Sequence, residues 1–421
     1  MSKYLSKLNS FICAPDFLNQ LWTIISIGTF TVFPSLLVFI VTRQVGLVYA
    51  GMLVYAFALA DLPSVLAMFG VRALQNVDIK QEYKFSVYLW QRTICTILAT
   101  VGFIAFLILA DFGLLQLTVV LLVFIICLTN AYADVFLGEL QQKGMMRVAG
   151  KMKTSALAAA LAVASIVLII SNSLVISLIV ASIVVIAGYI LWIWAYRKNF
   201  GDIRVKIDVS AIKKLTMAVL PILVTEFLMV YVGNAQKYYL EAYVSIEIVA
   251  IFSFMMLPIS LLYLACVGLF QGAIVTKTAR ILESDSRRFK QRVNRQLLAA
   301  IGLPVPCLIF VYFFGPQILS WIYATQLLPY RPQLMLLFFG ATTRIPVFVL
   351  GPVLVILRKQ KQVLYGSIVI ALTVGPLMWY LVSNYGLQGA AYSNIIILFP
   401  QSVMYYVMYR IALHKREIGM G

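Results

Sequence analysis

The sequence predicts an all-α integral membrane protein with about twelve transmembrane helices in two six-helix lobes. Of its 421 residues, 62% are hydrophobic and only 11% are charged, a composition outside the range of soluble domains. Apolar stretches of about twenty residues, the length that crosses a hydrocarbon core, recur along the whole chain. The 33 Lys and Arg residues outnumber the 15 Asp and Glu residues, and they concentrate in every second connection between these stretches.

The apolar stretches predict the spans in order. In the first half we expect helices near residues 18–42, 47–71, 86–110, 114–136, 154–171 and 175–196. In the second half we expect helices near residues 213–236, 246–272, 297–321, 332–356, 362–383 and 388–412. Two of the pairs are hairpins, because each long uncharged stretch is broken once by small polar residues, at 171–173 and at 383–386. The basic stretch 197–214 separates the predicted lobes, 1–203 and 204–421.

The alternation of basic and bare connections predicts the orientation of the chain. Basic connections resist transfer across a membrane and stay cytoplasmic, so we expect both termini on the cytoplasmic side. The segment before the first span carries Lys3, Lys7 and Asp16 without the pattern of a cleavable signal peptide. The net charge of +18 therefore indicates orientation and contact with anionic membrane lipids, and no nucleic-acid partner is expected.

Other composition features argue against metal and histidine chemistry. The five cysteines stand singly, without the spacing of a metal site, and the one histidine, His414, is near the C-terminus. No metal or other cofactor is therefore expected.

The two halves of the sequence resemble each other in one respect. Arg43 ends the first predicted span and Lys237 ends the seventh, and prolines follow at similar distances, Pro63 and Pro258. This favours a parallel six-plus-six repeat, an arrangement that permits alternating access. Packing is the other reading of these prolines, because proline is common in membrane helices.

Several cations lie in or at the ends of predicted spans. A cation in hydrocarbon costs roughly 2.5–3.5 kcal/mol, so it usually faces a water-filled cavity or an anionic partner. Arg344 lies well inside the tenth span, and either a cavity or an ion pair would accommodate it. Arg72 and Arg92 lie near cytoplasmic span ends, where they can line a cavity or extend toward the interface. Arg43 and Lys237 lie at outer ends, where a lipid headgroup is the alternative contact.

Two carboxylates lie about midway along predicted spans. Asp61 in the second span and Glu226 in the seventh either pair with a cation or bind a proton or sodium ion, which would couple transport to an ion gradient. Asp134, near the cytoplasmic end of the fourth span, is expected to be a solvated cap.

These cations predict the chemistry of a bound molecule. Guanidinium groups match phosphate oxygens, and several cations together suit a pyrophosphate. Four tyrosines surround Lys237, and they could stack on sugars or anchor span ends at the interface; they are Tyr231, Tyr238, Tyr239 and Tyr243. A basic, aromatic cavity would fit an anionic lipid headgroup that carries sugars.

Six segments in family order carry a resemblance to known proteins. They are 41–46 (VTRQVG), 69–78 (FGVRALQNVD), 83–86 (YKFS), 134–144 (DVFLGELQQKG), 231–238 (YVGNAQKY) and 385–391 (YGLQGAA). In these segments the chain resembles the Wzx-type oligosaccharide flippases of the polysaccharide transporter family. That family lies in the multidrug/oligosaccharidyl-lipid/polysaccharide (MOP) superfamily, with the multidrug and toxin extruders (MATE) and the lipid II flippase.

The resemblance implies a V-shaped pair of lobes like those of MATE proteins and lipid flippases. It also implies the flipping of undecaprenyl-pyrophosphate-linked oligosaccharide repeat units across the bacterial cytoplasmic membrane, for capsule, O-antigen or exopolysaccharide. A polysaccharide polymerase and glycosyltransferases would be partners, and coupling to H⁺ or Na⁺ is left open. Arg43, Arg72 and Lys237 stand where such relatives tend to carry cavity or motif cations. Gln236 stands where they often have proline.

The predicted binding site for pyrophosphate and glycan therefore combines residues from both halves. It comprises Arg43, Arg72, Arg92, Lys237, Tyr238 and Arg344, with Asp61 or Glu226 as a coupling residue. A multidrug or organic-cation antiporter of the same superfamily is the main alternative, although the charges within the spans are not predominantly acidic. A polysaccharide polymerase would need a large external loop with basic or histidine residues, which the sequence does not show.

Overall fold

The computed structural model describes residues 15–75, 78, 82–200, 208–270, 281, 286–357 and 359–417, and the regular structure in these ranges is helical. The expected lobe boundary at residue 203, the N-terminal residues Lys3 and Lys7, and Asn76 and Val77 of the second resemblance segment lie outside the described residues. The chain divides into two compact units, Met1–Val230 and Tyr231–Gly421.

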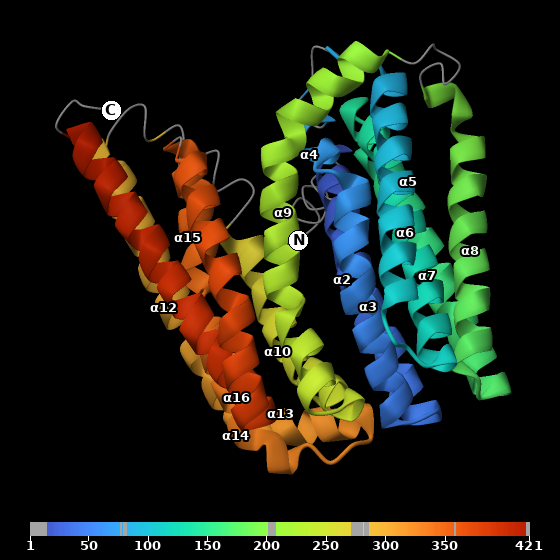
Figure 1. The fold of residues 1–421 in the computed structure, drawn as a ribbon. Helices are drawn as coiled ribbons and strands as arrows, with labels where there is room; N and C mark the ends of the chain where they lie inside the picture. The colour runs from blue at the N-terminus through green and yellow to red at the C-terminus, as the bar shows by residue number, and fades with distance from the viewer. Residues whose placement is uncertain are drawn as a thin grey trace, which may run out of the picture. The chain divides into compact units, whose positions relative to one another are not determined.

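The first unit is a bundle of long helices joined by short connections (Figure 1). Its elements in order are α2 (Pro15–Gln44), α3 (Leu47–Met68), α4 (Val71–Gln75), α5 (Phe85–Leu109), α6 (Leu114–Gln142), α7 (Met146–Ser171), α8 (Leu174–Ala195), the 3₁₀ helix η1 (Arg197–Asn199) and the first part of α9 (Val209–Tyr243). Helix α3 packs on α6, and α7 packs on both α2 and α8.

The second unit begins inside α9, at Tyr231. Its further elements are α10 (Ile246–Phe270), α12 (Ser286–Gly302), α13 (Pro304–Tyr323), the 3₁₀ helix η2 (Leu328–Tyr330), α14 (Arg331–Thr343), α15 (Ile345–Ile356) and α16 (Gln360–Glu417). Helix α16 packs on α14 and α15.

The number of spans agrees with the sequence prediction. Among the described residues, 11 helical stretches are long and apolar enough to cross a membrane. The last of them, Lys361–His414, has 54 residues, which would measure about 81 Å as one straight helix against a core of about 30 Å. Gly386 (φ 53°, ψ −130°) breaks this stretch within the predicted turn 383–386, so it contains two spans and the total is about twelve.

The other predicted hairpin is also confirmed. Asn172 ends α7 in the left-handed conformation (φ 49°). The Ser173 hydroxyl then accepts a hydrogen bond from the backbone N–H of Ile176 (3.4 Å) and caps α8. These are the polar residues at which the uncharged stretch was expected to turn.

Two predicted spans are found as long apolar stretches, and each contains a one-residue turn at which the backbone keeps right-handed helical angles, Leu303 in one and Arg344 in the other. The stretch 297–321 divides between α12 and α13, and the stretch 332–356 divides at Arg344 between α14 and α15. A proline stands in the first turn of each following helix, Pro304 in α13 and Pro346 in α15. Proline lacks an N–H group and fits the first turn, so it begins a helix more readily than it continues one.

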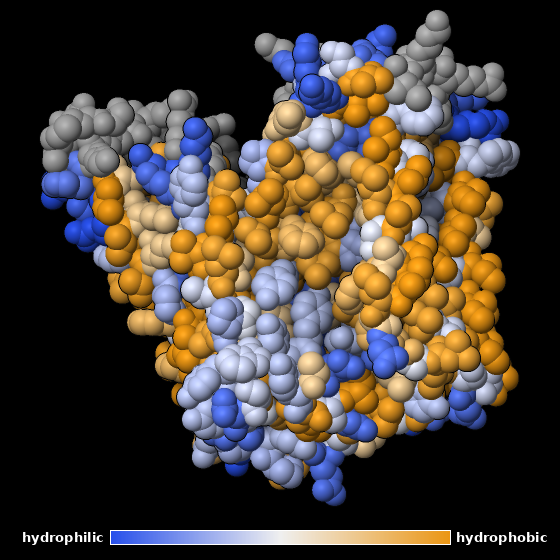
Figure 2. Space-filling model, in the orientation of Figure 1, coloured by the Kyte–Doolittle hydropathy of each residue, from blue (hydrophilic) through white to orange (hydrophobic). Residues whose placement is uncertain are grey.

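The lateral surface of the helices is apolar. On the face drawn in Figure 2, hydrophobic side chains cover the side of α8, and hydrophilic ones gather near the helix ends. Large apolar residues on α5 and α8 are exposed, such as Leu98 (65%), Ile108 (78%) and Leu191 (65%). Apolar exposure on this scale is unfavourable in water and matches a hydrocarbon environment. The chain is a multi-pass membrane protein.

Candidate functional site

The site in the first unit begins with an abrupt end of α3. Phe69 (φ 51°) and Gly70 (φ 64°) both adopt the left-handed conformation, and α4 follows immediately with Arg72 in its first turn. A Cβ atom at Gly70 would lie 2.8 Å from Cγ2 of Ile222 on α9. Glycine is therefore required here for its backbone angle and for the close approach of α9, and this turn sets the position of Arg72.

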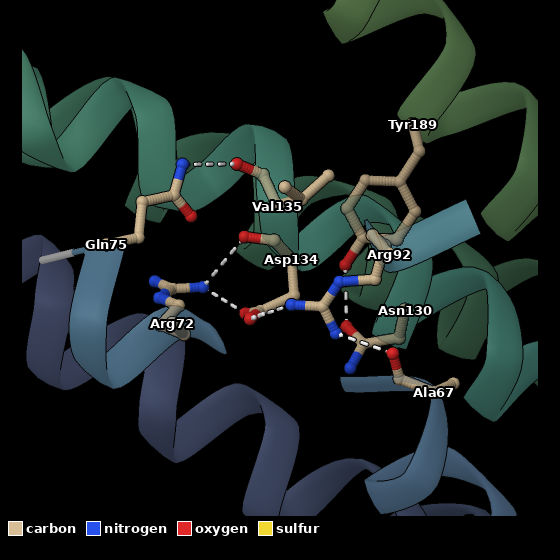
Figure 3. Close-up of polar contacts among 8 residues, drawn as sticks. All are labelled: Ala67, Arg72, Gln75, Arg92, Asn130, Asp134, Val135 and Tyr189. Carbon is tan, nitrogen blue, oxygen red and sulfur yellow. Dashed lines mark hydrogen bonds and ion pairs between the residues drawn. The ribbon is translucent and has the colours of Figure 1, made fainter. Parts of the chain in front are cut away.

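Asp134 on α6 lies between two arginines from different helices (Figure 3). Nη1 of Arg72 forms an ion pair with Oδ1 of Asp134 and also donates to its backbone carbonyl (3.4 Å). Nη2 of Arg92 on α5 lies 3.6 Å from Oδ2 of the same carboxylate. Arg92 also donates a hydrogen bond from Nη1 to the carbonyl of Ala67 at the end of α3 (3.2 Å). One carboxylate thus joins α4, α5 and α6.

The depth of this cluster corrects two expectations. The side chain of Arg92 has no exposed surface and that of Asp134 is 11% exposed, whereas that of Arg72 is 27% exposed. Asp134 is therefore not a solvated cap, because α6 continues to Gln142, about two turns beyond it. Arg92 does not extend toward an interface, because Asp134 and the carbonyl of Ala67 hold its guanidinium inside the bundle.

Neighbouring polar residues hold the backbone around Asp134. Gln75 on α4 donates to the carbonyl of Val135 (3.3 Å), and its amide oxygen lies where a side chain at Gly138 would collide with it. On the other side, the Tyr189 hydroxyl donates to Oδ1 of Asn130 (2.7 Å), one turn before Asp134 (Figure 3).

A cavity of about 620 Å³ opens beside this cluster, within the first unit. Four charged side chains line it, namely Arg72, Asp134, Lys153 on α7 and Glu226 on α9. The ammonium group of Lys153 lies 4.2 Å from the ring centre of Phe30, and among the described residues it forms no ion pair. The volume lies in the range of ligand-binding pockets.

The predicted fifth span starts at residue 154, so that prediction leaves Lys153 in the basic connection before it and outside the predicted site. Helix α7 begins at Met146, eight residues before the predicted span start at 154, so Lys153 lies about two turns inside the helix. The basic residues just before Thr154 resemble a loop in the sequence. The start of the helix is therefore predicted at the first residue of the uncharged stretch.

The structure brings three of the predicted site residues together. Arg72, Arg92 and Glu226 belong to or adjoin the cavity of the first unit. Arg43 and Asp61 are not among its lining residues. Arg43 is exposed at the end of α2, with its guanidinium 5.0 Å from the ring centre of Phe39, and Asp61 is half-buried on α3.

Lys237 and Tyr238 lie in the part of α9 that belongs to the second unit. Nζ of Lys237 donates to Oδ1 of Asn234 (2.9 Å), and the amide of Gln236 donates to Oδ1 of Asn394 on α16 (3.1 Å). Helix α9 runs through Gln236 without a break. At this position, where the resemblance implies a proline, the chain therefore keeps a continuous helix.

Arg344 lies at the junction of α14 and α15. Its guanidinium carbon is 5.8 Å from the ring centre of Tyr263 on α10, and the Tyr263 hydroxyl donates to the carbonyl of Ala341 (3.1 Å). Within the described ranges Arg344 forms no ion pair, so the alternative of a fixed ion pair is not found there. Its role in binding stays a prediction.

The described residues contain no group of three or more His, Cys, Asp or Glu side chains that could hold a metal ion. The charged side chains that line the first-unit cavity can form ion pairs and hydrogen bonds with a bound molecule. Two cations and two carboxylates line it, and Arg92 adds a third cation behind Asp134.

Comparison with known proteins identifies the fold. No protein-family model and no curated protein matches the sequence. Among solved structures, the chain is similar to an inward-facing multidrug resistance MATE transporter of the MOP superfamily, with a TM-score of 0.64 and 14% identity over 95% of this chain and 100% of that one. It is also similar to a mutant of the Vibrio cholerae MATE transporter VcmN, with a TM-score of 0.61 and 13% identity over 96% and 98% of the two chains.

A third similar structure is a MOP superfamily transporter from Pyrococcus furiosus, with a TM-score of 0.57 and 14% identity over 96% of this chain and 97% of that one. Its description states that a reversed polarity of its binding pocket suggests a different function. These similarities confirm the predicted fold class: the chain is an all-helical membrane protein with the fold of MATE transporters of the MOP superfamily.

Proposed function

We propose that this protein is a transporter, not an enzyme, and that it flips undecaprenyl-pyrophosphate-linked oligosaccharides across the bacterial cytoplasmic membrane. The observation that carries the proposal is the pair of cations, Arg72 and Lys153, in the cavity of the first unit. An anionic headgroup would be a counter-ion for Lys153, because among the described residues its ammonium group lies over the ring of Phe30 and forms no ion pair.

The ion pairs around Asp134 favour an anionic ligand over a cationic one. A single carboxylate balances one of its two arginines, so the cluster keeps an excess positive charge. Arg72 contacts Asp134 through Nη1, and a guanidinium has five N–H donors. Its partly exposed side chain could therefore bind phosphate oxygens while it stays paired with Asp134.

The other predicted residues complete the proposed cycle. Arg43, Lys237, Tyr238 and Arg344 would contact pyrophosphate and glycan as the lobes alternate, while the prenyl chain stays in lipid. Fully buried Arg92 would act by positioning Asp134. Asp61 or Glu226 would couple the cycle to H⁺ or Na⁺. Both termini would be cytoplasmic. Glycosyltransferases would act before transport, and a polymerase would act after it.

The direct test measures flipping in proteoliposomes that contain a fluorescent undecaprenyl-pyrophosphate oligosaccharide. The Lys153→Gln variant should lower the flipping rate by about ten- to a hundredfold, because a charged hydrogen bond contributes about 1.5–3 kcal/mol. The matched control is Lys151→Gln, because Lys151 is on the same helix and near an aromatic ring, that of Trp22, but does not line the cavity. Equal rates for wild type and Lys153→Gln, at equal protein level, would remove the cavity from the mechanism.

A multidrug antiporter is the second candidate, and Glu226 is the observation that favours it. This carboxylate lines the same cavity and could bind an organic cation, and the similar structures include multidrug resistance transporters. Efflux of a fluorescent organic cation from proteoliposomes, lost in Glu226→Gln and kept in Lys153→Gln, would support this function and contradict the flippase.

A further inference from the structure

A basic cavity lies in the second unit, between the end of α10 and one face of α12. Its volume is about 610 Å³, and three arginines line it, Arg288, Arg292 and Arg295. They are spaced i, i+4 and i+7, so they lie on one face of α12. The opposite side of the helix is buried through Phe289 and Val293, both fully inaccessible.

Two of the arginines of this cavity, Arg292 and Arg295, lack anionic partners in the described part of the chain. No Asp or Glu is among the described lining residues. Nε of Arg292 is buried and has no hydrogen-bond acceptor among the residues that the structure describes. A buried N–H donor without an acceptor is unfavourable, and an oxygen-rich anion in the cavity would supply the acceptor.

The walls of the cavity add an apolar component. Leu269 and Phe270, in the last turn of α10, line it beside the arginines. Leu269 is 51% exposed, and Leu298, one turn beyond Arg295 on α12, is 72% exposed. A site with cations next to exposed apolar side chains suits a molecule with an anionic head and a hydrocarbon tail.

We propose that this cavity binds the phosphate group of an anionic phospholipid of the surrounding bilayer. The basic connection around α12 is predicted to be cytoplasmic, and basic pockets between helices on that side are suited to anionic headgroups. The arginines bind the phosphate oxygens, and the acyl chains lie along Leu269 and Leu298. This site is separate from the proposed transport cavity, because it contains residues of the second unit alone.

The test compares lipid-dependent thermal stability of the purified full-length protein in nanodiscs. Phosphatidylglycerol in a phosphatidylcholine bilayer should raise the Tm of wild type. In the Arg292→Gln/Arg295→Gln double variant the rise should be lost, with at least tenfold weaker binding of phosphatidylglycerol by native mass spectrometry. The matched control is Arg287→Gln, because Arg287 is on α12 but does not line the cavity, and it should keep the wild-type response.

Three results would overturn the proposal. An equal loss in Arg287→Gln would indicate a general surface charge effect. A rise of Tm in pure phosphatidylcholine with inorganic phosphate or pyrophosphate, equal to that with phosphatidylglycerol, would indicate an ion site and not a lipid site. An unchanged response of the double variant would exclude the arginines. If the double variant does not fold, the Arg292→Lys/Arg295→Lys variant replaces it and keeps both positive charges. Its rise in Tm should be smaller than that of wild type but above zero, because lysine cannot bind phosphate bidentately.

Discussion

Asp134 is the residue on which the charges of the first unit converge. Two guanidinium groups from α4 and α5 share its carboxylate, and only Arg72 keeps contact with the cavity. In a buried cluster of this kind, loss of one partner leaves an uncompensated charge, which costs far more than loss of an exposed ion pair. The cost of removing a charged residue from this cluster should therefore depend on how deeply the remaining charges are buried, and not on how many contacts are lost.

The first prediction ranks three substitutions in the cluster. Asp134→Asn should destabilise the protein by about 3–5 kcal/mol, because Arg92 would keep a buried charge without a counter-ion. Arg72→Gln should cost only about 1 kcal/mol, because its site is partly solvated and Asp134 keeps Arg92 as a partner. Thermal unfolding in detergent measures both.

Arg92→Gln provides the third value in that ranking and should lie between the other two, because Asp134 keeps Arg72 as a partner. Its loss removes the fully buried cation and the bond to Ala67 together. If Arg72→Gln proved as destabilising as Asp134→Asn, the burial argument would be wrong.

At the scale of elements, an interruption between helices holds a charged side chain in place. The left-handed pair Phe69 and Gly70 precedes Arg72, and the break between α14 and α15 falls at Arg344. An uninterrupted helix through Phe69 and Gly70 would direct Arg72 differently, whereas Arg344 keeps right-handed helical angles (φ −80°, ψ −17°). The left-handed break is thus part of the candidate site in the first unit.

The second prediction tests the break before Arg72. Gly70→Ala should destabilise the protein by about 1–3 kcal/mol, because alanine is strained at this positive φ and its Cβ would meet Ile222 at 2.8 Å. It should also lower the flipping rate, because α4 and Arg72 would shift. Thermal unfolding and the proteoliposome assay measure the two effects.

Gly28→Ala on α2 is the control for this substitution. A Cβ at Gly28 meets no atom within 4 Å, so alanine should leave stability unchanged or raise it by up to about 1 kcal/mol, as in an open helix position. Equal effects of the two substitutions would contradict the proposed role of the break.

The hydropathy of the sequence predicted the existence of the helices better than their ends. Helices α6 and α7 extend beyond the predicted spans, to Gln142 and from Met146, because polar residues can continue a helix after the apolar stretch ends. The environments of Asp134 and Lys153 depend on these extensions. Sequence hydropathy reports the apolar stretch alone, so it could not place either residue inside a bundle.

For the whole molecule, the alternation of charge predicts which connections face the cytoplasm. The turn between α7 and α8, at Asn172, belongs to the bare side, and the connection before α16, at Lys359, belongs to the basic side. Basic connections are retained in the cytoplasm during insertion, so these two positions should be on opposite sides of the membrane.

The third prediction follows from that topology. In a variant with its five cysteines replaced by alanine, Asn172→Cys should react with a membrane-impermeant maleimide in intact cells. Lys359→Cys should react only after the cells are permeabilised. The reverse pattern would invert the predicted orientation, and labelling of both in intact cells would contradict the span count between them.

The sequence by itself determined the membrane class, the approximate number of spans and both polar turns, because each depends on local properties: a long apolar run, a cluster of small polar residues, or a charge that is costly to transfer. The partners of buried charges were decided by the tertiary structure. Asp134 meets Arg72 and Arg92, and Lys153 meets Phe30, across helices that are distant in the chain. Packing brings such residues together, and no local pattern encodes which buried charges become neighbours.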